Sequence, residues 1–79
     1  MSKEDIFYIV QSYILEKIPD LNIELINNEL DFNHLSLLKI DKDSLLREFV
    51  DIFNISFNVN RLDEICCMGD VIEYIYSHL

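Results

Sequence analysis

The chain is poor in the residues that turn or break a polypeptide, with one glycine and one proline among 79 residues. Tight turns and β-hairpins depend on these residues and on pairs such as Asn-Gly or Asp-Gly, which the chain also lacks. Half of the residues, 51%, are hydrophobic, which is typical of a chain that folds. The composition therefore favours an all-α domain over a sheet built from hairpins.

Cysteine is scarce as well, and its placement excludes the usual cysteine chemistry. Cys66 and Cys67 are adjacent, and neighbours in sequence rarely have the geometry for a disulfide. They lack the C-x-x-C spacing of zinc and redox sites, and the two histidines, His34 and His78, are remote in sequence. We expect two reduced thiols, at least one of them packed as a small hydrophobe, and no bound metal.

Long apolar runs are missing too. No stretch approaches the ~20 residues that a membrane-spanning helix needs. The first residues lead into an amphipathic segment and not into the apolar region of a signal peptide. We therefore expect a cytoplasmic protein.

Basic residues are scarce: the chain has 6 of them against 15 acidic residues, which gives a net charge of -9. Phosphate backbones and anionic lipid headgroups repel such a chain, so neither nucleic acid nor a membrane surface is an expected partner. A basic patch on another protein is the natural complement.

Enzyme signatures are also absent from the sequence. There is no Gly-rich phosphate loop, no G-x-S-x-G and no pair of metal ligands at helical spacing. His34 lies in a predicted loop, and His78 lies at the C-terminal end of a predicted helix, where the helix dipole favours a cation. We expect both histidines to be structural, and we expect no enzymatic activity.

The chain does contain helical periodicity, spread over a single domain of residues 1–79. Apolar residues at helical spacing predict a helix over 3–17, which Ser2 begins as a cap and Pro19 ends. A final helix is predicted from Gly69 to Leu79. Its apolar pattern starts at Val71, and Met68 lies one turn before Val71.

Between these two helices the pattern is weaker. A second helix is predicted over about 39–53 with Asp41 or Asp43 as its cap, and one or two helical turns are predicted over 58–65. Apolar residues alternate over 19–33, but no partner strand is evident, so a long ordered loop is predicted there. We expect three apolar side chains to anchor this loop in the core, namely Leu25, Leu30 and Phe32. The predicted core is Ile6, Val10, Tyr13, Leu46, Phe49, Phe53, Ile65, Val71, Ile72 and Ile75.

The last third of the chain resembles the acyl carrier protein family, and the rest follows without a gap. The resemblance covers nearly the whole length, and it is most specific in the final helix, at Gly69-Asp70 and the apolar residues that follow. It implies a small four-helix bundle with three longer helices and one short one. The matching positions are Phe32, Leu35, Leu45, Leu46, Phe49, Phe53, Ile55, Phe57, Ile65, Gly69, Asp70, Ile72, Tyr74 and Ile75.

The family's attachment site is where the chain departs from the pattern. In the family, a serine carries phosphopantetheine as a phosphodiester, and an aspartate precedes it. In the ungapped register Lys39 stands on the serine and Leu38 on the aspartate. A lysine amine cannot accept that group, so we expect Lys39 to face outward near the start of the second helix and no cofactor to be attached.

A competing register is present at Asp43-Ser44-Leu45, which is the family's own tripeptide. If it is correct, phosphopantetheine is carried on Ser44. This register shortens the second helix by five residues before Phe53 and puts Phe32 out of register. Ser36 is a third possible acceptor.

The resemblance implies a partner surface on the second helix, which is acidic in the family and docks basic patches of enzymes. Here half of all the bases lie on that segment, so the predicted surface has mixed charge. Its predicted residues are Lys39, Lys42, Asp43, Arg47 and Glu48.

Three functions follow from these observations. The first is a monomeric carrier-like binding module without phosphopantetheine, which contacts an enzyme of acyl, polyketide or peptide biosynthesis. The second is a working carrier loaded on Ser44. The third is a small acidic inhibitor or immunity-type protein whose helical fold matches by coincidence.

Overall fold

The computed structural model describes residues 1–32, 41–56 and 64–79. In these ranges the chain forms three α-helices, α1 (Lys3–Lys17), α3 (Lys42–Phe53) and α4 (Met68–His78), and one turn of 3-10 helix, η1 (Ile23–Leu25). The all-α prediction is confirmed. No helix in the described ranges is both long enough and apolar enough to cross a membrane.

Helix α1 has the predicted bounds, and its caps explain them. The Ser2 hydroxyl accepts a hydrogen bond from the Asp5 backbone N–H, and the Asp5 carboxylate accepts one from the Ser2 N–H, both at 3.2 Å. These two bonds form a capping box that satisfies donors left unpaired at a helix start. Hydrogen bonds from Ser2 to the Asp5 carboxylate, chiefly the one from the Ser2 backbone N–H, lower the pKa of Asp5. At the other end Pro19 follows Ile18, whose N–H still donates to Ile14.

Helix α4 begins at Met68, and the side chain of Asp70 organises its start. One Asp70 carboxylate oxygen accepts the backbone N–H groups of Cys66 and Cys67, at 3.0 and 3.4 Å. Gly69 lies where α4 meets the segment before Phe32, and its N–H donates to the Asn28 carbonyl at 2.9 Å. A Cβ at position 69 would lie 3.2 Å from that same carbonyl oxygen, so the close approach favours glycine.

Residues 19–32 form an ordered connection, as predicted, but one of the residues predicted to anchor it in the core is exposed instead. Leu25 is 55% exposed, whereas its neighbour Ile26 is 1% exposed and belongs to the core. Phe32 is fully buried and Leu30 is half-buried, as expected. The connection also has a partner that the sequence did not suggest, since Asp31 forms an isolated antiparallel bridge with Cys67.

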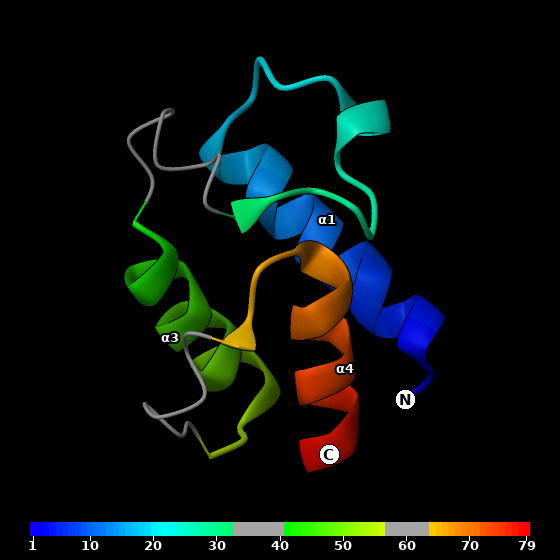
Figure 1. Cartoon of the computed structure of the whole chain (residues 1–79), viewed down its shortest axis with the longest axis vertical. Coiled ribbons are helices and arrows are strands. Elements are labelled where there is room, and N and C mark those ends of the chain that lie inside the picture. The colour runs from blue at the N-terminus through cyan, green and yellow to red at the C-terminus, as the bar shows by residue number, and fades with distance from the viewer. Residues whose placement is uncertain (33–40, 57–63) are drawn as a thin grey trace.

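The core lies between α1, α3 and α4, with the connection packed over one end (Figure 1). In Figure 1 α4 crosses in front of α1, and α3 stands beside α4. The ten predicted core residues are buried except Tyr13, which is half-buried because its hydroxyl reaches a polar group on α3. The core also takes in Ile14, Ile26, Phe32, Leu45, Met68 and Tyr74.

Several sequence predictions fall wholly or partly outside the described ranges. The short helix predicted over 58–65 lies mostly in residues 57–63, although Ile65 at its end is buried as expected. The second helix was predicted to begin near residue 39, but α3 begins at Lys42, behind an extended Asp41. Lys39 and Ser36 lie outside the described residues.

Candidate functional site

The candidate site is the first turn of α3, which Asp41 caps. Asp41 has the extended backbone of an N-cap (φ -80°, ψ 120°), and its carboxylate accepts the Asp43 backbone N–H at 3.3 Å. A carboxylate here also lies at the positive end of the helix dipole, and such a cap stabilises a helix by about 0.5–2 kcal/mol. Of the two caps that the sequence allowed, the structure uses Asp41.

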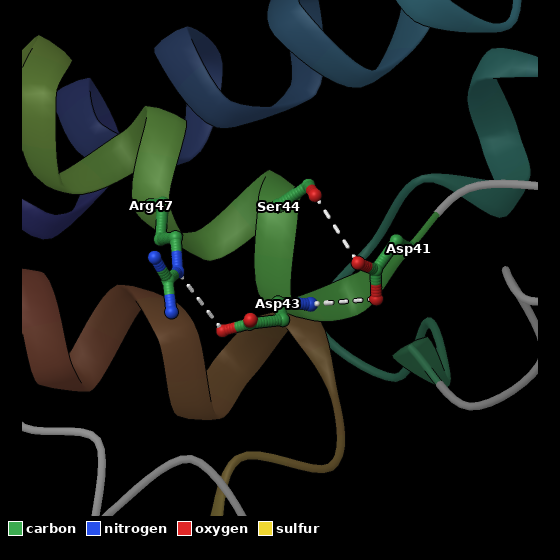
Figure 2. A network of polar contacts seen from close by, with 4 residues as sticks. All are labelled: Asp41, Asp43, Ser44 and Arg47. Carbon is green, nitrogen blue, oxygen red and sulfur yellow. Dashed lines mark hydrogen bonds and ion pairs between the residues drawn. The ribbon is translucent and has the colours of Figure 1, made fainter.

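Ser44 projects from this first turn into solvent, and its hydroxyl is held by the cap. The Ser44 Oγ donates a hydrogen bond to the second Asp41 carboxylate oxygen at 3.1 Å (Figure 2). The Asp41 carboxylate therefore holds both the backbone of residue 43 and the side chain of residue 44. The hydroxyl is exposed, but it lies directly against a negative charge.

Arg47 lies one turn later on the same face and contacts Asp43. The Arg47 Nε donates to the Asp43 carboxylate at 3.3 Å, and both side chains are exposed to water. Such an (i, i+4) pair contributes only about 0.3–0.5 kcal/mol to the helix. The pair places one negative and one positive group on the exposed surface of α3, while Ser44 points toward Asp41 (Figure 2).

Glu48, which the sequence grouped with Arg47 and Asp43, lies apart from them. Its carboxylate faces α1, where the Lys17 ammonium lies 3.3 Å away. The hydrogen bond from the Tyr13 hydroxyl, with Lys17 adding to it, lowers the pKa of Glu48. Lys17 also sits over the Tyr13 ring, at 5.3 Å from its centre. Glu48 therefore joins α3 to α1.

The structure thus brings together part of the predicted partner surface. Asp43 and Arg47 are in contact, and Lys42 is the first residue of the same helix. Glu48 points to the α1 junction. Asp41 is the residue that the sequence prediction considered only as a cap, although it is the one that contacts Ser44.

The two cysteines show no site chemistry. Cys66 is exposed and Cys67 is half-buried, and both are free thiols. Adjacent residues in an extended segment point to opposite sides, which fits their difference in exposure. No group of histidine, cysteine or carboxylate side chains that could hold a metal ion occurs among the described residues.

The described structure contains a small apolar cavity and two larger open hollows. An apolar cavity of about 10 Å³ lies between α3 and α4, lined by residues that include Leu46, Phe49 and Tyr74. This volume is that of about one water molecule, too small for a small-molecule ligand. Two open hollows of about 360 Å³ each flank the start of α4 and share Asp70 and Glu73 in their walls.

No protein-family model matches this chain, and no curated protein is significantly similar to it.

Proposed function

We propose that this chain is a small helical binding module, similar to acyl carrier proteins in sequence pattern but without phosphopantetheine. It acts through contact between the first turns of α3 and a partner protein, an enzyme of acyl, polyketide or peptide biosynthesis. The observation that carries this proposal is the polar network on the first turn of α3, in which Asp41 holds the exposed Ser44 hydroxyl.

The network disfavours a phosphodiester on Ser44 through the product and not through the nucleophile, since a carboxylate that accepts the hydroxyl hydrogen bond can act as its base. Transfer of phosphopantetheine would replace the hydroxyl hydrogen by a negatively charged group beside Asp41, whose Oδ2 now accepts a hydrogen bond from the Ser44 Oγ at 3.1 Å. Like charges at this separation repel one another, and the serine would lose its hydrogen bond at the same time.

The same surface has the features of a protein contact. Asp43 and Arg47 form a pair on the outer face of a regular helix, with Lys42 one residue before Asp43. Charged groups fixed on a rigid element set the rate and the orientation of docking more than the affinity. Lys42 and Arg47 are two of the 6 basic residues of a chain whose net charge is -9, so α3 carries mixed charge.

One observation favours the alternative, a working carrier with phosphopantetheine on Ser44. The family presents its serine at the start of the second helix, and Ser44 lies on the first turn of α3. The ungapped register instead places Lys39 at the attachment position, two residues before the Asp41 cap. The two functions differ in whether phosphopantetheine is covalently attached to Ser44, and this attachment can be measured.

Intact-mass spectrometry after incubation with coenzyme A and a promiscuous phosphopantetheinyl transferase tests this difference. We expect the wild-type chain to gain no mass, because Lys39 stands at the family's attachment position and a phosphodiester on Ser44 would lie against the Asp41 carboxylate. An unrelated carrier protein in the same tube confirms that the transferase is active. A gain that Ser44→Ala abolishes would identify an ordinary carrier loaded on Ser44. A gain that persists in Ser44→Ala would place the group elsewhere and would equally contradict the proposal.

The protein contact is tested by reversing one charge on α3. Arg47→Glu is expected to reduce capture of a specific partner by affinity purification from the native cell extract. Lys3→Glu, on α1, is the matched control, since it changes the net charge equally and also breaks one exposed ion pair, the one with Glu73. Circular dichroism verifies that both variants fold. Equal recovery of every protein by wild type and Arg47→Glu would show that α3 is not the contact surface.

A further inference from the structure

The turn η1 holds two large aliphatic side chains in solvent. Ile23 is 51% exposed and Leu25 is 55% exposed, although both lie within three residues of the fully packed Ile26. A single exposed aliphatic residue is ordinary on a protein surface, and a neighbouring pair on one short turn is a more specific feature.

Hydrogen bonds on all sides keep this turn in place. The Asn22 side chain accepts the Glu24 N–H at 3.0 Å, and the Asn27 side-chain amide donates to the Glu24 carbonyl at 3.0 Å. From α1, the Gln11 amide donates to the Ile26 carbonyl at 3.0 Å. A surface that is ordered before it binds loses less conformational entropy on binding. The aliphatic pair is therefore presented in a preorganised form.

The segment that carries the pair has charged residues of one sign. Between Ile18 and Phe32 there is no lysine or arginine, and the acidic residues Asp20, Glu24 and Glu29 are all exposed. An apolar centre inside a charged rim is the usual arrangement of a protein-binding surface. A complementary partner combines an apolar pocket with lysine or arginine around it.

We propose that η1 is a docking surface for a basic protein partner, with Ile23 and Leu25 entering an apolar pocket and the surrounding acids facing lysine or arginine. A second copy of this chain fits poorly, because its equivalent acids would meet these acids. The proposal is independent of the one for α3, since η1 and α3 lie on opposite sides of the molecule in Figure 1.

A synthetic amphipathic helix of leucine and lysine is the probe, titrated into the isotope-labelled full chain and followed by NMR. We expect amide shifts concentrated in residues 20–29. The double variant Ile23→Ser/Leu25→Ser is expected to weaken binding by about tenfold or more, as for loss of a central apolar anchor. Tyr8→Ser/Ile52→Ser is the matched control, because it removes two exposed apolar residues from α1 and α3.

Two further peptides separate the electrostatic contribution to binding from the apolar one. Replacing lysine by glutamate in the probe is expected to abolish binding through charge repulsion, and replacing leucine by glycine is expected to abolish it through loss of the anchor. The proposal is overturned if the leucine-lysine peptide does not bind, if its shifts map to α4 or α3, or if both double variants bind it equally. It is also overturned if sedimentation shows that the free chain dimerises through Ile23 and Leu25.

Discussion

Replacing Phe49 with alanine is expected to lower the free energy of unfolding by about 3–5 kcal/mol. Phe49 is 1% exposed at the centre of α3. The Tyr13 ring packs edge-on against the Phe49 ring, with 5.4 Å between the ring centroids. The truncated side chain would enlarge the small apolar cavity that Phe49 already lines between α3 and α4. Because a domain of this size has only about 5–15 kcal/mol of stability, much of the protein would unfold at moderate temperature. Urea denaturation followed by circular dichroism measures the loss.

Ile52→Ala on the same helix is the matched control. Ile52 is 46% exposed, so its truncation is expected to change stability by no more than about 0.5 kcal/mol. Ile72→Ala on α4 is expected to cost about 2–5 kcal/mol, because Ile72 is 5% exposed within the same core. Wild-type-like unfolding of Phe49→Ala and Ile72→Ala would contradict the packing of α3 and α4 described above.

The second large effect is expected in the connection between α1 and residue 32. Ile26→Ala should cost about 2–5 kcal/mol, whereas Leu25→Ala should cost no more than about 0.5 kcal/mol. The two residues are neighbours of nearly equal size, but Ile26 is 1% exposed and Leu25 is 55% exposed. The same denaturation measurement compares them directly.

This pair of variants also decides which residue anchors the connection. If Leu25→Ala proves the more destabilising of the two, the prediction that Leu25 anchors the connection is right and the register of residues 22–27 is different from that described. The pair further serves the binding experiment on η1, which requires that a truncated Leu25 leave the fold intact.

The helices themselves could be predicted from local chemistry. Ser2 and Asp5 form the capping box that begins α1, and Pro19 ends it, so both bounds follow from residues near each end. The apolar spacing of α4 likewise identified Val71, Ile72 and Ile75 as buried. Such features depend on contacts within a few residues, which a sequence pattern records directly.

The candidate site could be predicted only in part. Asp41 was one of two possible caps, and Asp43 and Arg47 were predicted as members of one surface; their spacing of four residues is one at which side chains on a helix can meet. Nothing in the sequence separated Glu48 from that group, because its partners Lys17 and Tyr13 lie on α1, about thirty residues earlier. The side of α3 to which Glu48 belongs depends on how two helices pack.

The sequence by itself determined that this chain is helical, where α1 ends and which faces of α3 and α4 are apolar. Only the tertiary structure decided that Ile26 and not Leu25 is buried, that Tyr13 stays half-exposed beside Glu48, and that Asp31 pairs with Cys67. Tyr13 is half-exposed because its hydroxyl reaches Glu48 on α3, whereas the positions of Ile26 and Asp31 share another reason. Residues 19–32 have no regular period, so their register is set by distant groups, namely the Gln11 side chain on α1 and the backbone at the start of α4, which hold the carbonyls of Ile26, Asn28 and Leu30.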